Sequence, residues 1–353
     1  MSLTRLRISN LRCITTADFE FSGRSNFVVG PNGAGKTSLL EAIYLLGRGR
    51  SFRTRHTRGL IRFSEESLTV FGETAADQSK LGVEVSGDGL SSRVNGEGGG
   101  GLSALARLFP VHVIDPKLHA LIESGPSERR RFIDGGVFHV EHTYLDRWRA
   151  YRRVLSQRNA ALKRGRIAEI EVWTAPLIEA GLAVHQLRRA YLDGLAPRVA
   201  ESAKRLSGLS LKMNYLAGWR AETSFGEALA SSWERDRQTG TTQVGPHRAD
   251  IGLRVEGQRL KDVASRGQQK LVAAALVLGQ VGQFEAQASQ TGTLLVDDPA
   301  AELDDDSLQG LIRELDLLRA QKIITGLRLQ TLKANKTDPT FHVKHGKFEP
   351  VVY

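Results

Sequence analysis

GPNGAGKT, residues 30–37, is the stretch that most constrains the fold of this 353-residue chain, because it matches the pattern G-x-x-x-x-G-K-[ST]. In such a loop the glycines let backbone N–H groups wrap phosphates, the lysine reaches the β- and γ-phosphates, and the last hydroxyl binds Mg²⁺. The β-rich run SNFVV precedes the loop and the apolar-periodic run SLLEAIYLL follows it, which indicates a strand, a loop and a helix in that order. We therefore predict a site for ATP and Mg²⁺. Its nucleotide-binding residues are Gly30, Pro31, Asn32, Gly33, Ala34, Gly35, Lys36, Thr37 and Ser38.

A carboxylate for the metal ion comes from the run LLVDD at 294–298, an apolar strand that ends in two acids. Asp297 then joins Thr37 as a metal ligand, and Asp298 is the catalytic residue that orients or deprotonates the attacking water. Aspartates often end strands at turns, so this pattern indicates chemistry only in combination with the glycine loop.

A second unusual helix start is SRGQQK at 265–270, which precedes the apolar run LVAAALVLGQ. Ser265 and Gln268 fit an S-x-x-Q capping box. The box explains neither Gly267, which costs about 1 kcal/mol relative to alanine in a helix, nor cations at a helix end that favours acids. Exposed N–H groups and the helix dipole would bind an anion there. The candidate residues are Ser265, Arg266, Gly267, Gln268 and Gln269.

The net charge of +10 at pH 7 is concentrated in two stretches. Residues 128–166 contain eleven basic and four acidic side chains, and residues 44–62 contain six arginines and no acid. Clustered positive charge suits a polyanion such as DNA, although a solvated helix face explains the same pattern. The candidate DNA-binding residues are Arg129, Arg130, Arg131, Arg149, Arg152 and Arg153.

The environment of the protein is constrained by what the sequence lacks. With Cys13 as its single cysteine, the chain has no internal disulfide. It has no run of 18 apolar residues, and its N-terminus MSLTRLRISN alternates polar and apolar residues instead of forming a signal-peptide core. We expect a cytoplasmic, nucleoid-associated protein without membrane contact.

The order of patterns predicts an α/β fold with an insertion. Residues 1–115 and 236–353 are rich in strand-like runs, and residues 116–235 are mainly helical. We expect two antiparallel helices of about 30 residues each in the insertion, which span about 45 Å at 1.5 Å per residue. The glycine tract 96–101 is expected to be one hairpin tip.

The motifs together resemble those of ABC-type ATPase heads, in which a Walker A loop, an S-x-G-Q-Q signature, a Walker B strand and a D-loop occur in this order. The D-loop positions here are Glu302, Leu303 and Asp304. More narrowly, the chain resembles the RecF family. This resemblance covers nearly the whole chain and is carried by GRSFRT (49–54), SGPSERRRFID (124–134), VGPHRAD (244–250), SRGQQK and DDPAAELD (297–304).

The resemblance implies a P-loop head in which the signature contacts, in trans, the γ-phosphate of ATP held by a second copy. It further implies an ATP-dependent homodimer that binds duplex DNA and single-strand/duplex junctions in recombinational repair, replication restart and the SOS response to DNA damage. RecR, with RecO, would be its partner in loading recombinase at gaps. Hydrolysis would be weak, DNA-stimulated and switch-like.

Three departures from the wider ABC pattern point to slow hydrolysis. Asp298 stands where glutamate is usual, no glutamine lies near residues 115–117, and Gly326 takes the place of a switch histidine. An SMC-like structural DNA-binding ATPase remains the alternative, which the short predicted helices disfavour. A transporter subunit fits less well, because this chain lacks the Q-loop glutamine and the switch histidine that such subunits usually have. A metabolic P-loop kinase fits less well, because it would have no signature motif like SRGQQK.

Two motif residues have structural interpretations. We expect His247 in VGPHRAD to hold a loop in preference to contacting nucleotide or DNA, and Ser127 with Glu128 to cap a helix.

Overall fold

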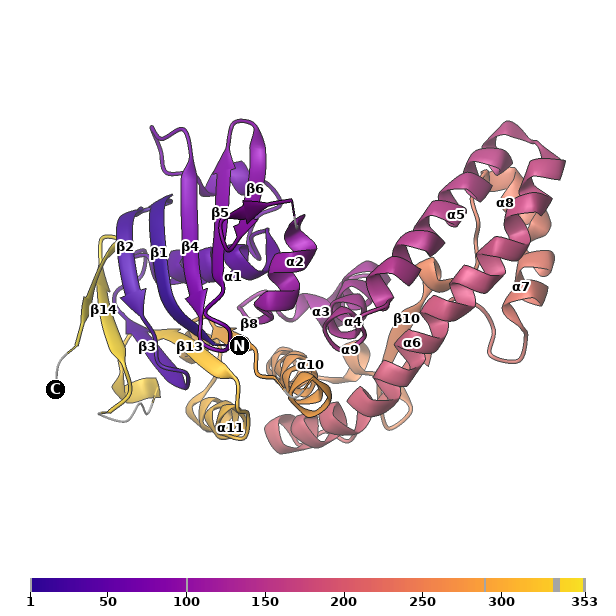
Figure 1. Cartoon of the computed structure of the whole chain (residues 1–353). Helices are drawn as coiled ribbons and strands as arrows, with labels where there is room; N and C mark the ends of the chain where they lie inside the picture. Colours follow the sequence, from indigo (N-terminus) through magenta and orange to yellow (C-terminus); the bar gives the residue numbers. More distant parts are fainter. Residues whose placement is uncertain (1, 100, 289, 333–336, 352–353) are drawn as a thin grey trace. The chain divides into compact units, whose positions relative to one another are not determined.

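The computed structural model describes residues 2–99, 101–288, 290–332 and 337–351. The chain forms two compact units, one from residues 1–118 and 276–353 and the other from residues 119–275. The first unit is an α/β head whose two parts are distant in sequence, and the second is mainly helical (Figure 1). The predicted fold class, an α/β head interrupted by a helical insertion, is confirmed.

The first sheet of the head is antiparallel, and its strands alternate buried with exposed side chains, as in a sheet packed on one face. In its first hairpin Leu6 pairs with Phe19 and Ile8 with Ala17. The strand order is β2 (Ile14–Glu20), β1 (Leu3–Leu11), β4 (Leu68–Thr74), β5 (Lys80–Ser86), β6 (Gly89–Val94) and β7 (Glu97–Gly98).

The prediction of a single hairpin tip across residues 96–101 is wrong. Asn95 and Gly96 both have positive φ, 51° and 86°, which makes them the tight turn between β6 and β7. The helix α2 (Gly101–Leu108) begins at the end of the tract. An Asn-Gly pair closes a hairpin in two residues, so Gly98 belongs to β7 and Gly101 begins α2.

The second sheet of the head is parallel from β14 to β8, and β15 adds an antiparallel edge. Its central strands are almost completely buried, as expected for parallel strands covered on both faces. The strand order is β15 (Lys347–Pro350), β14 (Thr340–Lys344), β3 (Ser25–Val29), β13 (Gln321–Gly326), β12 (Thr293–Val296) and β8 (Val111–Ile114).

The helix α1 (Lys36–Arg48) packs against strands of both sheets and so joins them into one core (Figure 1). Its Leu39, Leu40 and Ile43 are fully buried. α10 (Arg266–Gln287) spans the boundary between the units, and its residues from Leu276 onward belong to the head. The remaining helical segments of the head are η1 (Thr57–Leu60), η3 (Pro299–Ala301), α11 (Asp305–Asp316) and η4 (Gln330–Leu332).

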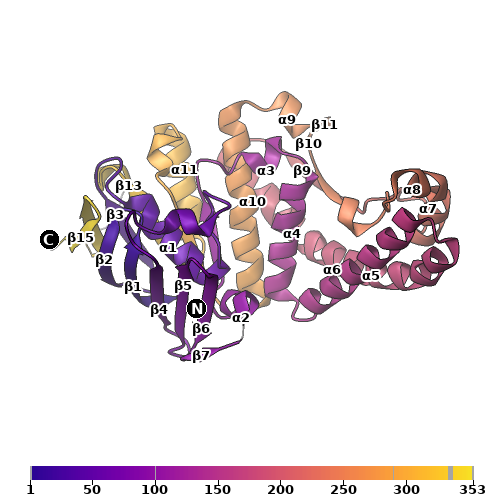
Figure 2. The same ribbon diagram turned by 90° about the horizontal axis from the view of Figure 1, so that it is seen from above.

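The second unit is built around α5 (Tyr144–Arg164) and α6 (Ile167–Ser207), which lie side by side (Figures 1 and 2). They contain 21 and 41 residues, where the sequence predicted about 30 each. Gly165, at φ 68°, ends α5 early, whereas α6 continues through Pro176 and Pro197 to Ser207 and is capped by Gly208. The shorter elements are α3 (Ala120–Glu123), α4 (Pro126–Val140), α7 (Phe225–Ser231), α8 (Trp233–Thr239), η2 (Pro246–Arg248) and α9 (Leu260–Val263).

A small antiparallel sheet of β11 (Gln258–Arg259), β10 (Asp250–Val255) and β9 (Leu211–Leu216) completes the second unit. Because β10 pairs with β9 along its whole length, residues 250–255 belong to this unit, which ends at residue 275. In the described part of the chain no helix combines the length and hydropathy needed to cross a bilayer.

A buried ion pair in the second unit alters the surface charge that the sequence suggested. Arg158 on α5 is 1% exposed, and its Nη1 lies 2.8 Å from Oδ2 of Asp236 and 2.7 Å from the Thr242 hydroxyl. One of the eleven basic residues counted in 128–166 is therefore neutralised inside the fold by an acid from outside that stretch.

Candidate nucleotide site

The glycine loop joins β3 to α1, and backbone geometry explains its glycines. A Cβ atom on Gly30 would lie 2.3 Å from the carbonyl oxygen of Val343 on β14, so no other residue fits there. Gly33 and Gly35 have φ values of 77° and 119°, in the region that favours glycine. The loop is also held by the amide of Gly346, which donates to the carbonyl of Ala34 at 2.8 Å.

The Lys36 ammonium lies over the loop. It donates to the carbonyl oxygens of Gly30 at 2.7 Å and Pro31 at 3.1 Å. Burial lowers the pKa of Lys36, and the nearby carboxylates of Asp298 and Asp297 oppose that effect. A partly desolvated cation held at the glycine loop is suited to bind a phosphate oxygen.

Asp297 and Thr37 meet at the end of β12. The Thr37 hydroxyl lies 3.0 Å from both carboxylate oxygens of Asp297, although 260 residues separate the two in sequence. Burial raises the pKa of Asp297, and its hydrogen bonds with Thr37 and Thr325 oppose the rise. The predicted pair of metal ligands is thus brought together.

These two residues fit Mg²⁺, which takes hard oxygen ligands and commonly uses one or two protein groups with phosphates and water. Their oxygens are adjacent. The Asp297 carboxylate is buried and has lost contact with water, and a bound metal ion would compensate for that loss. Among the described residues no cluster of three or more His, Cys, Asp or Glu side chains could hold a metal by itself. The phosphates of a nucleotide would therefore have to complete the coordination.

Asp298, the predicted catalytic residue, follows directly and adopts a left-handed conformation with φ 44° and ψ 58°. Its Oδ1 is buried and has no hydrogen-bond partner among the described residues. Burial raises its pKa, which Lys36 lowers and Glu302 raises further. An unsatisfied buried carboxylate oxygen is costly unless it has a functional partner such as a water molecule.

Thr325 at the end of β13 is a site residue that the sequence analysis missed. It is fully buried, donates to Asp297 Oδ1 at 3.0 Å and accepts from the Asp298 amide at 3.0 Å. A single hydroxyl thus orients both aspartates. The available signal was the threonine that ends the strand run KIIT, because carboxyl ends of parallel strands meet at one edge of a sheet.

The signature residues lie in the second unit, at the start of α10. The capping box is confirmed, because Ser265 Oγ accepts from the Gln268 amide at 3.2 Å and Gln268 Oε1 accepts from the Ser265 amide at 3.0 Å. Gln269 is buried and donates to the carbonyl of Ala264 at 3.0 Å. Ser265, Arg266 and Gly267 are exposed, and the first turn contains no acid.

The three D-loop positions lie between η3 and α11. Asp304 caps α11, since its Oδ1 accepts from the Ser307 amide at 2.9 Å, and these hydrogen bonds lower its pKa. Leu303 is half-buried, as is Glu302, which lies close enough to Asp298 to raise the pKa of that carboxyl.

The six candidate DNA-binding arginines fall into two groups. Arg129 forms a two-point ion pair with Asp250, with distances of 2.7 and 3.0 Å, and Arg130 donates to the carbonyl of Ala249 at 2.8 Å. The other four are exposed: Arg131 contacts Glu128, and Arg149, Arg152 and Arg153 lie on α5. The exposed group is the one available to a polyanion.

The VGPHRAD motif is held by several helices of the second unit. His247 Nε2 lies 2.9 Å from the Thr242 carbonyl oxygen, and its Nδ1 lies 2.6 Å from the Tyr151 hydroxyl, which confirms its predicted role in holding a loop. Burial lowers the pKa of His247 to about 4, so the ring is neutral at pH 7. Arg188 of α6 donates to the Pro246 carbonyl at 2.7 Å.

The prediction that Ser127 caps a helix is wrong. α4 starts at Pro126 and its N-cap residue is Gly125, with no side-chain cap hydrogen bond. Proline favours the first helical position because its ring sets φ and it lacks an N–H, which moves Ser127 into the first turn.

The GRSFRT motif surrounds a buried carboxylate of α1. Glu41 is fully buried, accepts from the Ser51 hydroxyl at 2.5 Å and pairs with Arg12 at 2.6 Å. Ser51 Oγ in turn accepts from the amides of Arg53 and Thr54 at 2.9 and 3.1 Å. This motif therefore anchors the basic loop that follows α1.

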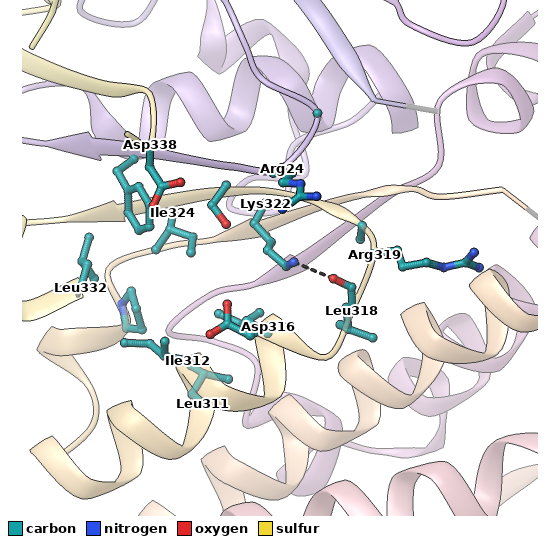
Figure 3. A pocket seen from close by; sticks show the side chains of 16 residues that line it. Arg24, Leu311, Ile312, Asp316, Leu318, Arg319, Lys322, Ile324, Leu332 and Asp338 are labelled. Carbon is teal, nitrogen blue, oxygen red and sulfur yellow. Dashed lines mark hydrogen bonds between the residues drawn. The ribbon is translucent and has the colours of Figure 1, made fainter. Parts of the chain in front are cut away.

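A cavity of about 590 Å³ lies elsewhere in the head, between α11 and strands β3 and β13 (Figure 3). Leu311 and Ile324 are among its apolar residues, and Lys322 donates within it to the Leu318 carbonyl at 2.6 Å. No residue of the glycine loop and neither aspartate of the LLVDD run lines it, so it is separate from the nucleotide site.

Known proteins of the same architecture resemble the whole chain. A solved structure described as the recombination mediator protein RecF with ATP in the RecFOR pathway superposes with a TM-score of 0.89, at 27% identity and 99% coverage of both chains. An Smc head bound to the C-winged helix domain of ScpA has a TM-score of 0.62 at 16% identity, which shows a shared fold alone.

Sequence relatives give the same result. The model of the RecF/RecN/SMC N terminal domain family matches residues 2–348. The DNA replication and repair protein RecF of Aliivibrio fischeri is 38% identical over 355 residues, which cover 98% of this chain and 99% of that protein. RecF of Azotobacter vinelandii is 39% identical over 360 residues, with 98% of both chains covered. The chain therefore belongs to the RecF family of DNA replication and repair proteins.

Proposed function

We propose that the chain binds Mg·ATP on its glycine loop, and that ATP drives two copies to assemble on DNA at gaps or junctions. The observation that carries this proposal is the contact of the Thr37 hydroxyl with both oxygens of Asp297, beside Asp298, whose buried Oδ1 has no hydrogen-bond partner among the described residues. The RecF relative solved with ATP supports the choice of nucleotide.

The residues of the site have separate tasks in this proposal. Lys36 and the loop amides bind the β- and γ-phosphates, and Mg²⁺ on Thr37 and Asp297 would neutralise charge that develops during transfer. Asp298 accepts a proton from the attacking water, and Thr325 keeps both aspartates in place. Weak ATPase activity then acts as a switch that dissolves the dimer.

The signature completes the site in trans. Ser265, Arg266 and Gly267 are exposed at the start of α10, and its first turn contains the cation Arg266 and no acid. The capping box satisfies the Gln268 amide, which leaves the first turn of α10 suited to the γ-phosphate on a second copy. The D-loop residues 302–304 would lie across the same dimer interface.

DNA binding is assigned to the exposed arginines of α5, together with Arg131. By membership of the RecF family, the dimer would act with RecR and RecO in loading recombinase during repair and replication restart. The length of α5, 21 residues, supports this role over an SMC-like structural one, which requires far longer coiled-coil arms.

Ser265→Arg tests the composite site. The arginine side chain would block the contact between the signature and the γ-phosphate on a second copy, so Mg·ATP should no longer produce dimers in sedimentation. ATP binding to the monomer should persist, because Lys36 and Thr37 bind the nucleotide without the signature. Ser127→Arg is the matched control, since Ser127 is also an exposed serine at a helix start. If Ser265→Arg dimerised like the wild type, SRGQQK would be only the capped start of a structural helix and not a signature that contacts ATP.

Replacing Arg149, Arg152 and Arg153 with alanine tests the DNA surface. Each arginine that neutralises a phosphate contributes about 0.9 to the slope of log affinity against log salt, so the slope should fall by up to about 2.7. Affinity should fall for all sequences alike. Alanine at Arg205, Arg235 and Arg237, which are also exposed, removes the same charge as a control. If the two triple variants gave equal slopes of log affinity against log salt, the α5 arginines would form a solvated helix face and not a DNA-binding surface.

A further inference from the structure

Phe63 is the most exposed large apolar side chain in the described part of the chain, with 93% of its surface accessible. The next most exposed, Val172, has 68%. Isolated exposed apolar side chains are common on protein surfaces and need no special account. The setting of Phe63 differs from that ordinary case in two respects, its backbone and its charged neighbours.

The backbone that leads into Phe63 is fixed to the head. The Arg62 amide donates to the Asn10 carbonyl at 2.9 Å, and the Arg12 amide donates to the Leu60 carbonyl at 2.8 Å. Leu60 is fully buried. The tip itself is closed by the Glu65 amide, which donates to the Arg62 carbonyl at 3.1 Å.

Ser64 next to Phe63 adopts a left-handed conformation with φ 69°, which is unfavourable for a residue other than glycine. The tip is thus a defined turn and not a loosely held loop. It presents the aromatic ring outward at little further cost in conformational entropy, which is how a preorganised contact gains affinity.

The chain that leads to this turn is strongly basic. Arg50, Arg53, Arg55 and Arg58 are all exposed, and residues 44–62 contain no acid. Arg53 lies 3.8 Å from the buried Glu41, whereas Arg55 and Arg58 form no ion pair among the described residues. Of the two acids beyond the tip, Glu65 accepts a hydrogen bond from the Asn10 side chain at 3.1 Å.

An isolated ring beside free cations matches a nucleic acid better than a protein surface. No other large apolar side chain is exposed within residues 2–99, so the contiguous apolar patch typical of a protein interface is absent from that range. Sites for unpaired nucleotides combine cations for the phosphates with an aromatic ring on which a base stacks.

We propose that Phe63 stacks on the exposed base at a junction between duplex and single-stranded DNA, while Arg55 and Arg58 contact the adjoining phosphates. This inference rests on the proposed DNA binding and adds to it a reason for preferring gaps over continuous duplex. The interior of a duplex offers no free base face, whereas a gap does. A stacking contact of this kind changes affinity by roughly 5- to 150-fold per base.

The test compares a gapped duplex with a covalently closed duplex circle of the same length, which has no ends and no unpaired base. Wild-type protein with Mg·ATP should prefer the gapped DNA. Phe63→Ala should reduce that preference by roughly 5- to 150-fold without weakening binding to the circle. With 2-aminopurine at the first unpaired position, wild-type protein should quench its fluorescence and Phe63→Ala should not.

Two further variants separate stacking from other contacts. Phe63→Trp should retain the preference and show quenched tryptophan fluorescence on gapped DNA, whereas Phe63→Leu, which is apolar without a ring, should behave like Phe63→Ala. ATP binding and the melting temperature should be unchanged in all three, because the side chain is exposed. An unaltered preference in Phe63→Ala, or full retention in Phe63→Leu, would overturn the stacking contact while DNA binding stands. Wild-type protein that binds neither DNA would instead contradict the proposed function, and this contact with it.

Discussion

Asp298→Asn is expected to lower ATP turnover by about 10²- to 10⁴-fold, the usual contribution of a general base, and to leave Mg·ATP binding intact. The Thr37–Asp297 pair is unchanged in this variant, so the ATP-bound dimer should accumulate on DNA. Asparagine has nearly the same volume and tolerates the left-handed backbone that Asp298 adopts, so the fold should persist. Single-turnover hydrolysis and sedimentation with Mg·ATP measure the two effects.

The pH dependence gives a second readout for the same residue. Burial raises the pKa of Asp298 above its ordinary value of 3.8. A base must be deprotonated to act, so wild-type hydrolysis should fall on acidification at a pH above that ordinary value, and the variant should lack this dependence. Asp316→Asn, which changes an aspartate in the cavity of Figure 3, is the control. Wild-type turnover in Asp298→Asn would remove Asp298 from the mechanism.

Lys36→Ala is expected to weaken ATP binding by roughly a hundred- to a thousandfold, because two charge-assisted hydrogen bonds to phosphate oxygens are lost at about 1.5 to 2 kcal/mol each. Dimerisation should disappear with it. Equilibrium dialysis measures the first loss and sedimentation the second. Unlike Ser265→Arg, which should keep ATP binding and lose only dimerisation, this variant should lose dimerisation because ATP binding itself is weakened.

Lys322→Ala is the matched control for Lys36→Ala. Burial lowers the pKa of both lysines, and both donate to backbone carbonyls of the head, but Lys322 lines the separate cavity. Its loss should leave ATP affinity unchanged. If the two variants weakened ATP binding equally, general damage to the head would explain the result and the nucleotide site would be misplaced.

Secondary structure was predictable wherever the information is local. The strand, loop and helix around GPNGAGKT, the first hairpin and the capping box of Ser265 and Gln268 all follow from residues within a few positions of one another. The local errors have local causes too. The Asn95-Gly96 turn closes its hairpin sooner than expected, and Pro126 shifts a helix start away from Ser127.

The number of charged residues in each stretch could be counted from the sequence, but which of them are exposed on the surface could not be predicted. Arg158 and Arg129 were counted among the basic residues, yet each is paired with an acid, Asp236 or Asp250, from far along the sequence. Composition cannot reveal such pairing, because burial of an arginine is acceptable only where the fold brings a partner to it. The exposed arginines of α5 are therefore a smaller group than the sequence suggested.

The sequence by itself determined the fold class, the order of motifs and the identity of the phosphate-binding loop, because these depend on short patterns of residue type and spacing. Only the tertiary structure decided which distant residues meet. Parallel pairing of β12 with β13, and of β13 with β3, sets their carboxyl ends along one edge, where Thr37, Asp297 and Thr325 form hydrogen bonds. That alignment is a property of the whole sheet, since hydrogen bonds between strands distant in sequence fix the register that no local pattern contains.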